Sequence, residues 1–256
     1  MMKARIVAVG NHKGGIGKTC TVANLGGILS RRGYKVLLID LDAQANLTSS
    51  LMESSDGATI YEAMTGKVGE LPIVVVTDNL HLVPSSLALA MVDVELSTAI
   101  ARERILSGCM AEAGVIEKYD FILLDCPPSL GLMTLNAFAT ATDIIIPMVS
   151  EVLPFKGLTM IRDFVAMVRH RLNPSVRIIG ILITRWEASK LSRGIEENLR
   201  QALGDVVFRT KIRKNVRLAE APLEKTDILG YDPRSNGAMD YQAFADEFLG
   251  RIQSTQ

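Results

Sequence analysis

The stretch that decides the fold spans residues 10–19 and reads Gly10-Asn11-His12-Lys13-Gly14-Gly15-Ile16-Gly17-Lys18-Thr19. It follows an apolar run at 6–9 and opens a helical pattern at 18–32. Glycines let the backbone turn so that successive N–H groups converge on phosphate oxygens. The start of the following helix adds its positive end at the same point. The sequence therefore predicts a phosphate-binding loop between a strand and a helix.

The side chains of this loop suit a nucleotide that carries Mg²⁺. Lys18 can reach the β- and γ-phosphates, and the Thr19 hydroxyl can ligate the metal. We expect the nucleotide to be bound by Lys13, Gly14, Gly15, Ile16, Gly17, Lys18, Thr19 and Cys20. The strict pattern GxxxxGK[ST] has glycine where this chain has His12, and Lys13 is a second lysine in the loop. Lys13 either reaches a phosphate, including one on a facing subunit, or is a solvated surface lysine.

Aspartates end two other apolar runs. They lie in Val-Leu-Leu-Ile-Asp-Leu-Asp at 36–42 and in Phe-Ile-Leu-Leu-Asp at 121–125. Ligands of open α/β sheets bind at the carboxyl ends of the strands. We therefore expect Asp125 and Asp40 near the metal, with Thr19, and Asp42 as the residue that orients the attacking water. A single strand-end aspartate could instead cap a helix or a turn, but three of them after a phosphate loop argue against that.

The rest of the chain alternates short apolar runs with longer helical patterns. We predict strands at 6–9, 36–39, 80–83, 121–124, 144–147 and 178–183, and helices at 18–32, 87–107, 132–141, 155–172, 192–203 and 236–252. The segment 53–79 is expected to be irregular, with a short helix near 61–64. This alternation predicts an α/β fold with a doubly wound, mainly parallel central sheet and helices on both faces. We find no linker that divides it, so residues 1–256 are expected to form one domain.

Composition excludes few partners. The 256 residues carry 28 basic and 28 acidic side chains, so only a local patch could attract nucleic acid. Three widely spaced cysteines form no CxxC pair, which favours a reducing cytoplasm. The start of the chain has no signal-peptide pattern, and there is no run of about 18 apolar residues that would insert stably in a membrane.

Four motifs taken together resemble a known family. KGGIGKT, LIDLDAQAN, FILLDCPPS and NVRLAEAP followed by GYDP are similar to the ParA/Soj partition ATPases, within the MinD-like deviant Walker group. The resemblance implies ATP and Mg²⁺ as cofactors and a homodimer that encloses two ATP molecules. Lys13 would cross to the partner's nucleotide, Lys18 and Asp42 would serve hydrolysis, and Asp125 matches the Walker B aspartate. Thr184 and Arg185 match a strand end that contacts the base, and Pro222 lies near the adenine.

The family also implies two macromolecular partners. ATP-bound dimers bind DNA non-specifically, and a ParB-like protein stimulates hydrolysis, so we expect a cytoplasmic, nucleoid-associated protein. The candidate DNA-binding residues are Lys190, Arg193, Lys211, Arg213, Lys214 and Arg217. The alternative for such a charge run is a solvated face. Four departures from the family are His12, Cys20 in place of a second threonine, DLDAQAN at 40–46 in place of DLDPQGN, and Ile212-Arg213-Lys214-Asn215 in place of IPRN.

Two other classes of function stay open. The runner-up is a MinD-like or other positioning ATPase that places a protein complex on the nucleoid or a membrane. The C-terminal helical pattern carries Arg251 as its one basic residue and also Asp246 and Glu247, so a helix packed on the sheet is the better interpretation. An iron–sulfur reductase would need two cluster-binding cysteines, but Cys126 follows Asp125 directly and is expected to be a buried packing residue.

Overall fold

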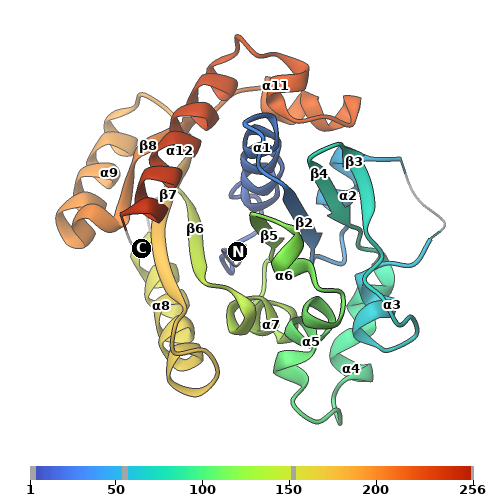
Figure 1. Cartoon of the computed structure of the whole chain (residues 1–256). Coiled ribbons are helices and arrows are strands. Elements are labelled where there is room, and N and C mark those ends of the chain that lie inside the picture. Colours follow the sequence, from blue (N-terminus) through green and yellow to red (C-terminus); the bar gives the residue numbers. More distant parts are fainter. Residues whose placement is uncertain (1–3, 54–56, 151–153, 255–256) are drawn as a thin grey trace.

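The sheet runs through the centre of the molecule and carries helices on both sides (Figure 1). The computed structural model describes residues 4–53, 57–150 and 154–254. Within them, eight strands follow the order β3-β4-β2-β5-β1-β6-β7-β8. Their bounds are β1 Arg5–Val9, β2 Val36–Asp40, β3 Val74–Thr77, β4 Leu80–Val83, β5 Phe121–Asp125, β6 Asp143–Val149, β7 Arg177–Trp186 and β8 Val207–Arg213. All neighbouring strands pair in parallel except β3 and β4, which confirms the predicted sheet.

Helices cover the two faces of the sheet in separate groups. The longer ones are α1 Lys18–Arg31, α5 Ile105–Glu112, α7 Leu132–Thr140, α8 Pro154–Arg171, α9 Lys190–Leu203 and α12 Asn236–Gln253. The shorter ones are α2 Asn46–Leu51, α3 Ile60–Met64, α4 Val92–Glu95, α6 Val115–Lys118, α10 Arg217–Glu220 and α11 Ile228–Tyr231. Apolar residues of α1, α2, α11 and α12 share one core, and those of α3 to α9 share the other.

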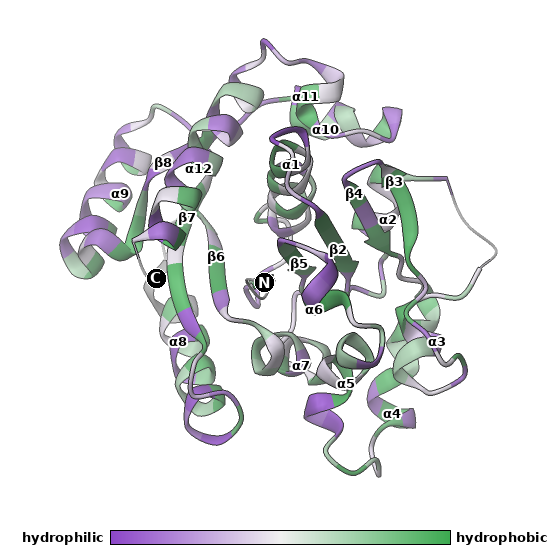
Figure 2. Cartoon of the chain, in the orientation of Figure 1, coloured by the Kyte–Doolittle hydropathy of each residue, from purple (hydrophilic) through white to green (hydrophobic). Residues whose placement is uncertain are grey.

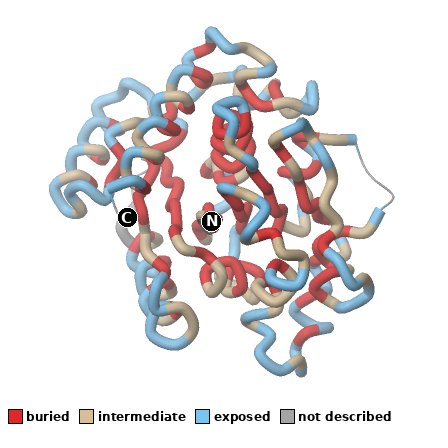
Figure 3. Tube along the Cα trace, viewed as in Figure 1, coloured by how far each residue is buried: buried red, intermediate tan, exposed pale blue. Residues whose placement is uncertain are grey.

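Alternation along the strands supplies both cores. In β2, Val36 and Leu38 belong to one core, while Leu37 and Ile39 belong to the other. Successive side chains of a strand point to opposite faces, so a strand covered on both faces must be apolar throughout. The central strands are accordingly hydrophobic, whereas α9 is largely hydrophilic (Figure 2). Burial follows the same division, with the central strands and α1 buried and the outer loops exposed (Figure 3).

Two strands, β3 and β8, were not predicted from the sequence. β3 lies in the segment expected to be irregular, and its residues alternate between half-buried and exposed because it is an edge strand that pairs only with β4. β8 lies in the basic run; its Phe208 and Ile212 are buried while Arg209 is exposed. In β8 polar residues separate the apolar ones, so the continuous apolar pattern on which strands were predicted is absent. β3 does carry a continuous apolar run, Val74-Val75-Val76, which the prediction of an irregular segment did not take into account.

The predicted helix at 87–107 is also wrong. The segment is divided among η1 Leu87–Met91, α4, η2 Arg102–Arg104 and the start of α5. Ala101 has a left-handed backbone with φ of 52°, which no α-helix contains. Several apolar residues of this segment, including Leu87 and Ile100, are exposed, so their spacing did not reflect one buried face. The predicted helix at 192–203 begins two residues earlier, at Lys190, because the Ser189 side chain caps it by accepting from the Ser192 N–H.

The C-terminal helix α12 packs on the sheet. Its Tyr241, Phe244, Phe248 and Ile252 are buried in the core shared with α1. Phe244 meets Phe208 of β8 edge-to-face, with ring centroids 4.9 Å apart. The apolar face of α12 is therefore covered by protein. None of the helices in the described part of the chain is long and apolar enough to cross a membrane.

Close packing of β7 against β8 gives a test of the fold. A Cβ added at Gly180 would lie 2.3 Å from the Phe208 ring, which Phe244 and Arg251 hold from other sides. We expect Gly180→Ala to lower the free energy of unfolding by about 1–3 kcal/mol. Gly194→Ala, in α9 with open space around it, is the matched control and should raise it by about 0.5–1 kcal/mol. Urea denaturation measures both, and equal effects would contradict this packing.

Candidate nucleotide-binding site

The phosphate loop joins the centre of the sheet to α1. β1 ends at Val9, and α1 begins at Lys18 without a side-chain cap. Gly15 and Gly17 have φ of 70° and 86°, in the left-handed region that glycine adopts most easily. The uncapped N–H groups in the first turn of α1 are donors suited to an anion. The strand, loop and helix thus have the arrangement that the sequence predicted.

Side chains hold several carbonyl groups of the loop. The Lys18 ammonium donates to the Lys13 carbonyl at 2.9 Å. Thr184 and Thr21 hydroxyls lie 2.7 Å from the carbonyl oxygens of Ile16 and Gly17, and the Arg185 guanidinium donates to Gly15 at 3.1 Å. A carbonyl that points at a neighbouring donor leaves its peptide N–H facing elsewhere, because the peptide unit is planar and trans. These bonds therefore favour a loop that presents N–H groups to phosphate.

Two aspartates lie next to each other at the carboxyl-terminal ends of neighbouring central strands. Asp40 and Asp125 are paired positions of β2 and β5, and both are fully buried. Neither carboxylate oxygen of Asp125 has a hydrogen-bond partner in the described chain. Burial raises the pKa of Asp125 well above its usual range, and the charge of Asp40 raises it further. The nearby Thr19 hydroxyl and Lys18 ammonium lower the pKa of Asp125, but neither group is within hydrogen-bonding geometry of its oxygens.

This orphaned carboxylate fits a divalent cation. Buried polar atoms are almost always satisfied, so the two free oxygens of Asp125 indicate a missing cationic or donor partner. A hydroxyl at Thr19 and a carboxylate at Asp125 are the oxygen donors that Mg²⁺ prefers, with water and phosphate completing the shell. Lys18 is buried beside them, and that burial lowers its pKa while Asp125 raises it.

Asp40 has a different environment from Asp125. Its Oδ2 accepts from the backbone N–H and the hydroxyl of Thr48, at 2.9 and 2.8 Å, and its Oδ1 accepts from the Asp42 N–H. Burial raises the pKa of Asp40 to about 6 in spite of these bonds. Because both oxygens already accept hydrogen bonds, the geometry favours a residue that fixes the start of α2 over one that ligates the metal directly.

Asp42 lies beside a small cavity of about 140 Å³. It is half-buried, and its Oδ1 accepts from the Gln44 N–H at 3.0 Å. Pro127 and Ser129, which follow Asp125 along the chain, line the same cavity. The arrangement leaves room for a water next to the carboxylate, and the role of Asp42 in orienting that water stays a prediction.

The remaining predicted residues lie in different surroundings. Lys13 is exposed, and its action on a partner's nucleotide stays a prediction. Thr184 is buried and binds the loop backbone, so a base contact by Thr184 or by Arg185 also stays a prediction. Pro222 is half-buried in η4 Ala221–Glu224, which packs against α2 and α10.

Cys20 faces the interior instead of a phosphate. Its sulfur accepts from the Tyr241 hydroxyl at 3.4 Å and from the Asn24 amide at 3.3 Å. Burial raises the pKa of this thiol, which keeps it neutral. Because the side chain points at Tyr241 and Asn24, the backbone N–H is the group of Cys20 that is suited to an anion. The Tyr241 hydroxyl also lies 3.3 Å from that of Thr21, which holds the loop at Gly17. Sequence reasoning missed Tyr241, and no local signal identifies it because it lies 221 residues beyond Cys20.

Carboxylates neutralise most of the basic run. Arg213 makes a two-pronged pair with Asp240, and Lys211 lies 2.6 Å from Glu196 and over the Trp186 ring. Lys214 pairs with Glu187, and Arg217 pairs with Glu220. Lys190 and Arg193, in the first turn of α9, are exposed and have no carboxylate partner in the described residues. The cations that are free to meet DNA are therefore fewer than the sequence suggested.

Fold and site together define a P-loop nucleotide-binding protein of the doubly wound class. A family model described as an AAA domain matches residues 4–178. The chain is 39% identical over 244 residues to the chromosome-partitioning ATPase Soj of Treponema pallidum, covering 94% of this chain and 95% of the relative. It is 38% identical over 248 residues to the sporulation initiation inhibitor protein Soj of Bacillus subtilis, covering 95% and 97%.

The same architecture occurs in a solved enzyme. The crystal structure of cobyrinic acid a,c-diamide synthase from Mycobacterium smegmatis with bound ADP and magnesium superposes with a TM-score of 0.85. The two chains are 30% identical, and the match covers 99% of this chain and 97% of the other. The chain belongs to the ParA/Soj family of ATPases, which confirms the resemblance drawn from its motifs.

The unmatched charge of Asp125 can be tested without nucleotide. Because burial raises the pKa of Asp125, its ionised form destabilises the folded state at neutral pH, and this cost falls as the pH drops. We expect Asp125→Asn to raise the free energy of unfolding of the nucleotide-free protein by about 1 kcal/mol or more. The wild type should gain stability as the pH falls from neutral to mildly acidic, and the Asp125→Asn protein should gain less.

Asp42→Asn is the matched control because Asp42 is half-buried and its Oδ1 keeps its backbone donor in the amide. It should change the unfolding free energy by less than about 0.5 kcal/mol. Denaturant titrations at several pH values measure the unfolding free energies of the wild type and of the two variants. A destabilised Asp125→Asn would show that the carboxylate is satisfied in solution.

Proposed function

We propose that this protein is a Mg²⁺-dependent ATPase whose ATP-bound homodimer binds DNA non-specifically and positions a DNA cargo. The observation that carries the proposal is the phosphate loop with two lysines, Lys13 and Lys18, beside the unsatisfied carboxylate of Asp125. The relative from Treponema pallidum, named a chromosome-partitioning ATPase over nearly the same length, supports the same activity.

The residues of the site divide the work of hydrolysis. The loop N–H groups and Lys18 hold the phosphates, and Thr19 and Asp125 hold Mg²⁺, with Asp40 supporting them from the neighbouring strand. When bound, Mg²⁺ neutralises charge on the β- and γ-phosphate oxygens. Asp42 orients the attacking water in the cavity beside it. Thr184, Arg185 and Pro222 would form the base side of the pocket, and the products are ADP and phosphate.

Dimerisation would supply a second lysine contact to the phosphates, which one subunit alone lacks. Lys13 is exposed on the loop, whereas Lys18 is buried and already engaged with the Lys13 carbonyl. A second lysine in such a loop is useful where it can reach a phosphate across an interface. Hydrolysis would be slow until a ParB-like partner stimulates it, and loss of the γ-phosphate would release the dimer and the DNA.

The role of Lys13 gives one test. We expect Lys13→Ala to abolish ATP-dependent dimerisation while ATP binding to the monomer falls by less than about tenfold, because Lys18 and the loop N–H groups remain. Light scattering after gel filtration with ATP measures the mass, and fluorescent-nucleotide titration measures binding. Lys18→Ala is the control that should lose both. A Lys13→Ala protein that dimerises with ATP like the wild type would remove the trans role.

DNA binding would centre on the first turn of α9. Lys190 and Arg193 are exposed there. In contrast, Lys211, Arg213 and Lys214, in or just after β8, pair with carboxylates. Counterion release makes even a few cations effective against phosphate backbones, and a dimer doubles their number. Lys211, Arg213, Lys214 and Arg217 would add a field that is weakened by their own partners.

This distribution of charge predicts which substitutions matter. Lys190→Glu with Arg193→Glu should weaken ATP-dependent binding to a random-sequence duplex by at least about tenfold. The slope of log K against log salt concentration should become shallower by roughly 3–4 in the dimer. The measurement is fluorescence anisotropy across a salt titration with ATP and with ADP. Lys35→Glu with Arg234→Glu, two exposed cations elsewhere, changes the total charge equally and should bind nearly as well as wild type. Equal losses in both variants would point to net charge alone.

The membrane-positioning alternative is less well supported. Its anchor would be an amphipathic C-terminal helix, yet Phe244, Phe248 and Ile252 of α12 pack into the core. We propose a cytoplasmic protein that acts at the nucleoid in preference to a membrane. A random-sequence duplex that fails to bind in every nucleotide state would leave the ATPase proposal intact and favour a protein cargo.

A further inference from the structure

A second basic region lies away from the nucleotide site. α8 and α9 border a groove of about 830 Å³ over the amino end of β7. Arg162, Arg169 and His170 line it from α8, and Arg177 lines it from β7. β7 runs from Arg177 to the loop contacts at Thr184 and Arg185, so the groove and the phosphate loop are separated by roughly 25 Å of strand.

The cations of the groove have no acidic partners within it. Among its described lining residues there is no aspartate or glutamate. Arg162 and Arg169 are exposed and form no ion pair with any described residue. Arg177 binds the buried Asp143 through Nε at 2.6 Å, but its buried Nη2 has no hydrogen-bond partner in the described chain. The exposed guanidinium groups of Arg162 and Arg169 are therefore available to an anionic partner, and Arg177 adds positive charge at the end of the groove.

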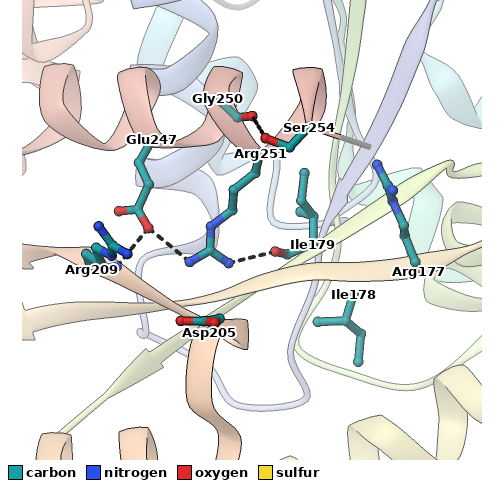
Figure 4. Close-up of a pocket in the computed structure, with 9 residues that line it drawn as sticks. All are labelled: Arg177, Ile178, Ile179, Asp205, Arg209, Glu247, Gly250, Arg251 and Ser254. Carbon is teal, nitrogen blue, oxygen red and sulfur yellow. Dashed lines mark hydrogen bonds and ion pairs between the residues drawn. The ribbon is translucent and has the colours of Figure 1, made fainter. Parts of the chain in front are cut away.

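The neighbouring groove differs in this respect. It lies on the other side of Arg177 and contains Arg209, Arg251, Glu247 and Asp205 (Figure 4). Glu247 accepts from the Arg251 guanidinium at 2.9 Å and from the Arg209 N–H at 2.8 Å. The Arg251 guanidinium also donates to the carbonyls of Ile179 and Val207. The Arg251 guanidinium thus already has internal partners, and Glu247 and Asp205 offset part of the positive charge that lines the neighbouring groove.

The floor of the α8–α9 groove is apolar. Val165, Ile181, Leu203 and Val206 line it between the cations, and Val206 is 41% exposed. Arg162 to His170 span nine residues of α8, or about 12 Å along the helix axis. That length suits two to three turns of a helix or a short extended segment.

We propose that the α8–α9 groove is a docking site for an acidic segment of a partner protein that also carries apolar side chains. Carboxylates would pair with Arg162 and Arg169, and the apolar side chains would cover the floor. A DNA duplex offers its phosphates on a wide convex surface, which leaves the recessed apolar floor uncovered. The site rests on no part of the ATP and DNA cycle proposed above.

A designed peptide tests the charge and the floor together. The probe is a fluorescein-labelled helical peptide of about 16 residues with Glu and Leu at amphipathic spacing, and its counterpart has Lys in place of Glu. We expect the Glu peptide to bind the full chain saturably and the Lys peptide not to bind. Raising the salt from about 50 to 300 mM should weaken the Glu complex, because the Debye length shortens.

Variants place the binding in the groove. Arg162→Glu with Arg169→Glu should weaken the Glu peptide by about tenfold or more, and Val206→Ser should weaken it several-fold. Arg171→Glu with Lys35→Glu, which are exposed and outside the groove, carries the same charge change and should stay within about twofold of wild type. Circular dichroism and phosphate release confirm that the variants are folded.

Three outcomes would overturn the proposal. They are the absence of saturable binding, equal binding of the Lys peptide, and wild-type affinity in the Arg162→Glu, Arg169→Glu protein. A fourth is a loss of duplex DNA binding in that protein with the peptide unaffected, which would make the groove a DNA surface. Each can be distinguished from failure of the proposed function, because peptide binding is measured without nucleotide.

Discussion

The parallel pairing of β1, β2 and β5 is the constraint on which the site depends. β5 lies between the other two, and its Asp125 is level with Val9 of β1 and with Asp40 of β2. The phosphate loop starts one residue after Val9, so the register alone brings the loop and both carboxylates to one edge. The same register buries two acidic groups side by side, and only one of them, Asp40, has its hydrogen bonds completed. A nucleotide-free protein thus retains charge that a cation would neutralise.

The loop also depends on segments far away in the chain. The matched family domain ends at residue 178, yet Thr184, Arg185 and Tyr241 contact the loop or its helix from beyond that point. The last part of β7 and α12 therefore complete a site that the first half of the chain begins. Asp240, the residue of α12 just before Tyr241, holds the end of β8 through its ion pair with Arg213. One turn of α12 thereby touches both the helix behind the phosphates and the basic strand.

Sequence was sufficient for the parts of the structure where local pattern and tertiary role coincide. The loop, its glycines and the strand-end aspartates could be identified because each lies beside an apolar strand of continuous pattern. Local pattern did not reveal β8, where Lys211 and Arg213 alternate with buried residues, and it misled at 87–107, where apolar residues lie on the surface. It could not find Tyr241, whose role comes from packing between α12 and α1. Long-range contacts of this kind leave no local signal.

The pairing of charges was equally invisible in the sequence. Equal numbers of acidic and basic residues say nothing about which cations have partners. In the folded chain, Glu196 and Asp240 satisfy Lys211 and Arg213, so the densest basic run carries little excess charge. The excess lies instead at the start of α9 and along α8, where Arg162 and Arg169 are seven positions apart. A long helix can hold such residues on one face, because positions three and four apart lie together. The surfaces available to anionic partners are therefore set by the packing of helices on the sheet, and the density of basic residues along the chain is a poor guide to them.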